Sequence, residues 1–150
     1  MSGEEYERSM AEHIQRAAAE RVRSDRVSLV EALELTRQQI AALLPEGRAT
    51  PQHHFHILLN DRGEPLGHYW LFVGRSPAAS LYDLFVVEQH RRQGVGRAAL
   101  THIERVATEH GCNCVWLNVL GHNDAARALY TNAGYQVGAV HMVKFMEPVG

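Results

Sequence analysis

The chain has 150 residues, of which 45% are hydrophobic and 21% are charged, and its formal net charge is -2 at pH 7. These values are typical of an ordinary globular protein, fit one domain over residues 1–150, and give no general reason to expect nucleic-acid binding. The longest apolar runs, such as WLFV and LFVV, are far shorter than the ~20 residues of a membrane-spanning helix. The start MSGEEYERSM is acidic and polar, unlike a secretory signal, so we expect a cytoplasmic protein with no membrane partner.

The first third of the chain predicts two helices. Residues 4–23 carry apolar side chains at three- and four-residue steps, the spacing of one helical stripe. Ser28 with Glu31 three residues later has the spacing of a capping box, and Pro45 marks the end of the second helix. The apolar positions expected to face the core are Tyr6, Met10, Ile14, Ala17, Ala18, Val22, Leu29, Leu33, Ile40, Leu43 and Leu44.

The rest of the chain alternates between strand and helix patterns. The segments HHFHILLN and EPLGHYWLFVG predict two strands joined in a hairpin at Asp61-Arg62-Gly63. The order helix, helix, hairpin, strand, helix, strand, helix, strand predicts a mixed α/β (α+β) domain built on one sheet. After the hairpin we expect a strand at 81–87, a helix at 98–110, a strand at 114–120, a helix at 123–133 and one or two closing strands within 135–145.

The loop EQHRRQGVGRAAL, which follows the third strand, is a candidate anion-binding site. Gly94 and Gly96 allow the backbone to approach a ligand closely and to adopt positive φ. The helix that follows points its free N–H groups and positive dipole end at the loop, and Arg91, Arg92 and Arg97 add positive charge. A plain strand-to-helix turn with solvated arginines has the same local pattern, so the loop alone leaves its ligand open.

Two nucleotide-binding interpretations of this loop meet specific objections. GVGRAA satisfies the dinucleotide pattern G-x-G-x-x-G/A, but EQHRRQ separates the strand from the first glycine, and WLNVLGHN offers no acid to hold a ribose. A mononucleotide P-loop requires Gly-Lys-Ser/Thr after the glycines, and the sequence has none there. A third ligand class, coenzyme A, carries a pyrophosphate that meets neither objection.

A second motif, HNDAARALYTNAGY, lies further along the chain. Asn123 can cap a helix, the small Ala126 lets a ligand lie against that helix, and Gly134-Tyr135 turns the chain. The pattern R-x-x-G-x-G after a strand, followed by N-x-x-A-x-x-L-Y-x-x-x-G-Y, resembles the GNAT superfamily of N-acetyltransferases. The resemblance covers about Leu81 to Tyr135, a little over a third of the chain.

The resemblance implies a fold and a cofactor. The implied fold is a mixed, mostly antiparallel sheet that splays apart between two central strands, with helices on both faces. The implied cofactor is acetyl-CoA, with its pantetheine arm along the third strand, its pyrophosphate in the glycine loop and its thioester sulfur near Tyr130. The residues implied to bind it are Phe85, Val86, Val87, Arg91, Arg92, Gln93, Gly94, Val95, Gly96, Arg97, Asn118, Asn123, Ala126 and Tyr130.

The chemistry implied by the resemblance is direct attack of a primary amine on the thioester. Tyr130 would give a proton to the leaving sulfur, although a core tyrosine bonded to a backbone carbonyl is the alternative. Asp83 lies two residues before Phe85, so the two side chains share a strand face. It could accept the amine proton through water, or simply pair with an arginine.

The acceptor is expected near GRATPQHHFH, where His53 and His54 are candidate substrate contacts. His54 and His56 share a strand face, but no third ligand at metal spacing accompanies them, so no metal site is expected. Family members usually open with a strand before the two helices, whereas this chain opens with a helix. If another chain supplies that sheet edge, the protein forms a homodimer.

Three functions stay open at this point. The first is acetyl transfer from acetyl-CoA to an amine of a small molecule or a peptide. The second is a sensor that binds coenzyme A or acyl-CoA without turnover, which the intact Tyr130 motif disfavours. The third is transfer from a longer acyl-CoA.

Overall fold

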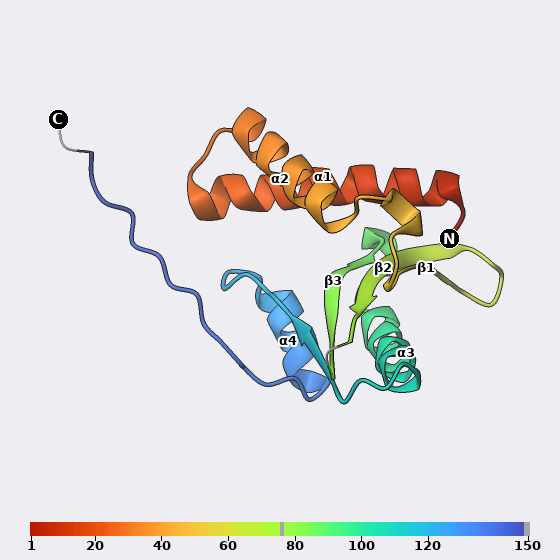
Figure 1. The fold of residues 1–150 in the computed structure, drawn as a ribbon. Coiled ribbons are helices and arrows are strands. Elements are labelled where there is room, and N and C mark those ends of the chain that lie inside the picture. The colour runs from red at the N-terminus through yellow and green to blue at the C-terminus, as the bar shows by residue number, and fades with distance from the viewer. Residues whose placement is uncertain (76, 149–150) are drawn as a thin grey trace. The chain divides into compact units, whose positions relative to one another are not determined.

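The structure is a computed structural model, and it describes residues 1–75 and 77–148 (Figure 1). The chain divides into two compact units, Met1–Asn118 and Val119–Gly150, which are described separately below. The single domain expected over residues 1–150 therefore stays a prediction. Among the described residues, no helix combines the length and the apolar character needed to cross a membrane.

The first unit opens with α1 (Gly3–Asp25), close to the predicted residues 4–23. Its N-terminus is a capping box: the Ser2 hydroxyl accepts a hydrogen bond from the Glu5 amide, and the Glu5 carboxylate accepts one from the Ser2 amide. Tyr6 and Ala18, two residues of the predicted stripe, are buried. The predicted apolar stripe of α1 therefore does face the interior.

The second helix, α2 (Leu29–Leu43), begins at the predicted cap. The Ser28 hydroxyl accepts a hydrogen bond from the Glu31 amide at 3.2 Å. The expectation that Leu29 faces the core is wrong, because its side chain is 53% exposed. The buried positions of α2 are instead the small residues Ala32 and Thr36, one helical turn apart, where the Thr36 hydroxyl bonds back to the Ala32 carbonyl.

The sheet of the first unit has four strands in the order β1-β2-β3-β4. The β1·β2 and β2·β3 pairs are antiparallel, which confirms the predicted hairpin, and the β3·β4 pair is parallel. Figure 1 shows α1 and α2 on one face of this sheet and α3 on the other. The strands are β1 (His53–Leu59), β2 (Pro65–Val73), β3 (Ala78–Val86) and β4 (Cys114–Leu117).

A β-bulge in β3 sets the face on which its functional side chains lie. Trp70 of β2 pairs with Asp83, whereas the next residue, Leu71, pairs with Leu81, so Tyr82 is the extra residue. A bulge of this kind re-aims the side chains beyond it. Here it places Asp83 and Phe85 on the sheet face that α1 covers, as their contacts with Arg16 of that helix show.

The helix α3 (Val95–Glu109) packs on the opposite face of the sheet. It begins three residues before the predicted residue 98, so Gly96 and Arg97 belong to its first turn. The largest fully buried side chains of the described chain are Tyr69 and Leu71 of β2 with Leu100 and Ile103 of α3. The main core therefore lies between α3 and the sheet.

The second unit contains α4 (Asp124–Asn132), which confirms the helix predicted for 123–133. The closing strands predicted within 135–145 are wrong, because residues 135–148 contain neither helix nor strand. The apolar side chains that suggested strands are largely exposed, namely those of Val137, Val140, Met142 and Val143. A strand forms only where a second strand takes up its backbone hydrogen bonds, and alternation in the sequence does not supply that partner.

Candidate functional site

The strands β3 and β4 pair over only part of their length. Their parallel pairing runs from Ala78 with Cys114 to Leu81 with Leu117. β3 continues to Val86, and within the described chain its residues after Leu81 pair with β2 alone. This is the splayed arrangement that the family resemblance predicted, and it leaves one backbone edge of β3 unpaired around Phe85.

The glycine loop ends at the N-terminus of α3. Gly94 is the N-cap residue and has φ +80°, as predicted, and no side chain of residues 1–75 or 77–148 caps this helix. The first intrahelical hydrogen bond runs from the Ala98 amide to the Gly94 carbonyl, so the amides of Val95, Gly96 and Arg97 lie ahead of it. These amides and the positive end of the helix dipole are able to donate hydrogen bonds to an anion. The positive φ expected for Gly96 is wrong, because this residue is already helical.

The three arginines of the loop have different positions. Arg91 donates from Nε to the Val86 carbonyl at 2.9 Å, and its guanidinium lies 5.5 Å from the Phe85 ring centroid. This side chain therefore joins the loop to the end of β3. Arg92 has φ +62°, and it is exposed, as is Arg97 in the first turn of α3. The last two arginines can reach an anion at the helix N-terminus without breaking a bond of the fold.

Asp83 is the centre of a charged cluster between α1 and the sheet. Its Oδ2 lies 2.8 Å from Arg16 Nη2, 3.2 Å from His13 Nδ1 and 3.0 Å from His68 Nε2. Burial alone raises the pKa of Asp83, but hydrogen bonds from His13 and His68 and the charges of His13 and Arg16 outweigh it and hold the pKa well below its usual range. Asp83 is thus a permanent carboxylate at neutral pH.

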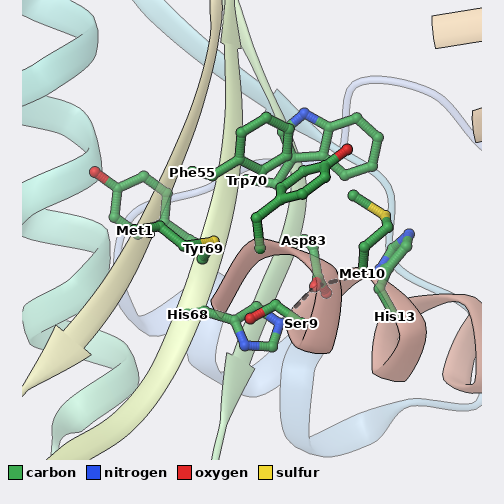
Figure 2. Close-up of a pocket in the computed structure, with 10 residues that line it drawn as sticks. Met1, Ser9, Met10, His13, Phe55, His68, Tyr69, Trp70 and Asp83 are labelled. Carbon is green, nitrogen blue, oxygen red and sulfur yellow. Dashed lines mark hydrogen bonds and ion pairs between the residues drawn. The ribbon is translucent and has the colours of Figure 1, made fainter. Parts of the chain in front are cut away.

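A small pocket opens beside this cluster. Figure 2 shows His13 reaching into it from α1 while His68 and Asp83 lie on the strands, with Phe55 and Trp70 as an aromatic wall. The pocket thus combines one anionic site with an apolar wall. The residues that line it are Met1, Tyr6, Ser9, Met10, His13, Phe55, His68, Tyr69, Trp70 and Asp83.

The two predicted acceptor histidines do not lie together. His53 accepts a hydrogen bond from Trp70 Nε1 at 2.9 Å and packs against Phe72, on the α1 face of the sheet. His54 faces α3, where its ring centroid lies 4.8 Å from that of His110. Successive residues of a strand point to opposite faces, so one pocket cannot be lined by both side chains.

His54 belongs to a second group of histidines, between β1 and α3. The ring of His56 lies 6.0 Å from that of His102 and 4.9 Å from that of Tyr69. Among the described residues, no group of three or more His, Cys, Asp or Glu side chains has the geometry of a metal site. Burial, followed by the charge of neighbouring histidines, lowers the pKa of His54 and of His56, which favours the neutral form of these two rings.

The histidines of β1 predict a pH dependence of stability. Burial also lowers the pKa of His53, so in all three the folded-state pKa lies below the unfolded value near ~6.5. Between those values the unfolded chain binds more protons than the folded chain. The free energy of unfolding therefore rises with pH in this range, and it decreases as the pH falls below about 6.5. Urea unfolding at about pH 7 and about pH 5 should show lower stability at pH 5. The variant His54→Asn should show a smaller loss, and equal loss in both proteins would contradict the assignment.

The remaining predicted residues lie in or next to the second unit. Asn118 follows β4 directly and is the last residue of the first unit. Asn123 caps α4 as predicted, with its Oδ1 accepting from the Ala126 amide at 3.1 Å. Tyr130 lies on α4, half-buried, with its ring centroid 5.7 Å from that of Tyr135. Gly134, at φ +94°, ends the helix as expected.

Comparison with known proteins identifies the family. The model of the "Acetyltransferase (GNAT) family" matches residues 10–135. This chain belongs to the GNAT acetyltransferase family. It is 30% identical over 147 residues to the uncharacterized N-acetyltransferase YdgE of Bacillus subtilis (strain 168), covering 96% of this chain and 94% of YdgE. As a GNAT protein it is an N-acetyltransferase, as the resemblance of its two motifs implied.

Two further relatives of this GNAT chain bear on fold and acceptor. The crystal structure of the putative acetyltransferase YycN from Bacillus subtilis matches with a TM-score of 0.92 at 29% identity, covering 99% of this chain and 96% of YycN. The [Ribosomal protein bS18]-alanine N-acetyltransferase of Escherichia coli (strain K12) is 36% identical over 62 residues, covering 41% of this chain and 42% of that enzyme. The second likeness is local to part of the GNAT fold.

Three members of the Asp83 cluster escaped sequence reasoning. His13 and Arg16 lie on α1, and His68 lies on β2. An arginine on a helix or a histidine on a strand carries no functional signal by itself. The one available signal was the spacing of His13 and Arg16, which places both on the helix face next to the stripe of Tyr6 and Met10.

Proposed function

We propose that this protein transfers the acetyl group of acetyl-CoA to a primary amine. The observation that carries the proposal is the edge of β3 that, among the described residues, no strand pairs with after Leu81. This edge leads through Arg91 to the N-terminus of α3, where no described side chain caps the helix. An extended chain can pair with such an edge, and a pyrophosphate can accept hydrogen bonds from the amides that follow. Pantetheine and pyrophosphate occur in this order in coenzyme A.

The residues of the chain divide into groups by the part of acetyl-CoA that they would hold. Phe85, Val86 and Val87 would lie along the pantetheine arm, and residues 91–97 would surround the pyrophosphate, with Arg92 and Arg97 contributing charge. We assign Asn118, Asn123 and Ala126 to the pantetheine side and Tyr130 to the sulfur. When bound, acetyl-CoA supplies an activated acyl group, and the chain contributes binding, orientation and proton transfer.

The acceptor in this proposal is an amine that enters as an ammonium ion. Asp83, held as a carboxylate, attracts a cation to the pocket between α1 and the sheet. Phe55 and Trp70 would contact an apolar group next to the amine, and His53, on the same sheet face, extends that wall. The likeness to an enzyme named for a ribosomal-protein alanine supports a peptide amine, while a small amine would meet the same groups.

The test is release of free thiol from acetyl-CoA in the presence of amines. The panel contains small amines, amino acids and peptides with an N-terminal alanine, and calorimetry measures acetyl-CoA binding in parallel. We expect binding of acetyl-CoA and amine-dependent thiol release. Binding without release for any amine would indicate a sensor, and faster release from longer acyl-CoA would change the donor.

A pair of arginine variants links turnover to the glycine loop. Arg97→Gln should raise the KM for acetyl-CoA and weaken its dependence on salt, because one charge near the pyrophosphate is lost. Arg62→Gln, in the exposed hairpin turn of the same unit, is the matched control and should leave the KM unchanged. Equal KM values in both variants would remove Arg97 from the cofactor site.

A further inference from the structure

In the Asp83 cluster, the residue that orients its neighbours differs from the residue that is suited to accept a proton from the amine. Within the described chain, the donors Arg16, His13 and His68 all converge on Oδ2 of Asp83. A carboxylate that accepts three hydrogen bonds, one of them from a guanidinium, is stabilised in its ionised form. Asp83 is therefore suited to hold and orient its neighbours and unsuited to take a proton from an amine.

His13 presents the geometry of an oriented base. Its Nδ1 lies 3.2 Å from Asp83 Oδ2, so the carboxylate favours the tautomer in which Nδ1 carries the proton. The lone pair then resides on Nε2, on the far side of the ring from the carboxylate. Its ring also packs edge-on against Trp70, with centroids 5.6 Å apart, which limits rotation of the imidazole.

His68 is less suited to this task. Its Nε2 lies 3.0 Å from Asp83 Oδ2 and 3.4 Å from Arg16 Nη2, so the same nitrogen faces both an acceptor and a cation. Its side chain is 8% exposed, compared with 17% for His13. His68 therefore serves to hold the cluster together, whereas His13 lines the pocket and contacts Asp83 through Nδ1, so that its Nε2 is not used in that contact.

We propose that His13 Nε2 accepts a proton from the acceptor ammonium group, with Asp83 as the positioning residue. The assignment rests on the proposed acetyl transfer. One ammonium proton moves to Nε2, and the nitrogen lone pair that this frees forms the N–C bond to the acetyl carbonyl carbon. The C–S bond breaks, the sulfur keeps the electron pair and takes the proton of the Tyr130 hydroxyl, the phenolate takes the second proton of the amine nitrogen, and His13 returns its proton to solvent. The net products are an amide, a thiol and one proton.

The charged and titratable groups around His13 come from several elements. Asp83 of β3 contacts it directly, Arg16 of α1 and His68 of β2 contact the same carboxylate oxygen, and the uncharged Phe55 of β1 lines the same pocket. Transfer requires His13 to be neutral, so kcat/KM should rise with pH and level off once the imidazole has lost its proton. The acidic limb of the pH–rate profile should therefore belong to His13.

Two substitutions at position 13 test the proposal in the intact chain. His13→Asn retains an amide donor near the position of Nδ1, so the bond to Asp83 can be kept while Nε2 is lost. His13→Gln is the complementary change. We expect kcat to fall by roughly 10²-fold or more in both, with the acidic limb lost and the Kd for coenzyme A unchanged. Added imidazole should restore part of the rate in His13→Asn, which a purely structural role would not allow.

The control is His102→Gln, on α3 and on the opposite face of the sheet, which should keep the wild-type kcat and pH profile. Thermal unfolding of each variant separates loss of the base from loss of the fold. If the wild type releases thiol and His13→Asn keeps the same kcat and the same acidic limb, the role of His13 is overturned while the proposed acetyl transfer stands. A wild-type protein that releases no thiol with any amine would overturn the proposed function and this assignment with it.

Discussion

Replacing Tyr130 by phenylalanine should lower kcat by roughly 10²-fold or more while the Kd for acetyl-CoA stays the same. The hydroxyl is the group assigned to the leaving sulfur, and the substitution removes it with little change in volume. The ring contact with Tyr135, at a centroid distance of 5.7 Å, does not need the hydroxyl. Thermal unfolding of the variant checks that the fold is kept.

Tyr135→Phe is the matched control for this experiment, because it removes the same hydroxyl from the other ring of the pair. Steady-state thiol release and calorimetric binding, measured on both variants, separate chemistry from binding. A pH profile adds a second test: the basic limb of kcat should disappear in Tyr130→Phe if the phenol must be protonated. If Tyr130→Phe turned over at the wild-type rate, the leaving thiolate would have to take its proton from another group.

Asp83→Asn should lower the stability of the fold substantially. The carboxylate accepts three donors on Oδ2, and an amide removes the negative charge that Arg16 needs. Breaking a buried pair of this kind costs about 3 kcal/mol, which for a chain of this size lowers the Tm by roughly 6–12 °C. kcat should fall as well, because His13 loses the group that orients it.

The stability difference between Asp83→Asn and the wild type should itself depend on pH. The pKa of Asp83 is lowered in the folded state, so its contribution is complete above the unfolded pKa near ~3.9. That contribution is lost as pH falls from there toward the folded pKa, so the two proteins should converge in stability below about pH 4. Asp61→Asn, in the exposed hairpin turn, is the control and should stay within about 0.5 kcal/mol of the wild type. An unchanged Tm in Asp83→Asn would mean that the cluster does not stabilise the fold.

The local elements were largely predictable because each depends on residues close together in the chain. Ser28 with Glu31 indicated the start of α2, Asp61-Arg62-Gly63 indicated the hairpin, and Asn123 indicated the start of α4. The strands predicted within 135–145 were wrong because strand formation depends on residues far apart in the chain. A strand depends on hydrogen bonds to another strand, and the sequence of the segment shows only the alternation of its side chains.

The two parts of the candidate site differ in the same way. The glycine loop with α3 was predictable from the sequence, and the pocket around Asp83 was not. The amino-acid sequence alone was enough to identify the glycine loop, the uncapped helix behind it and the family, because these are continuous motifs with strict spacing. The tertiary structure decided that Asp83 is held by Arg16, His13 and His68, three side chains from α1 and β2 that are far from it in the chain. It also placed His53 and His54 on opposite faces of the sheet. Long-range pairing and the bulge at Tyr82 set which side chains meet, so the three partners of Asp83 could not be recognised before the strands and α1 were packed together.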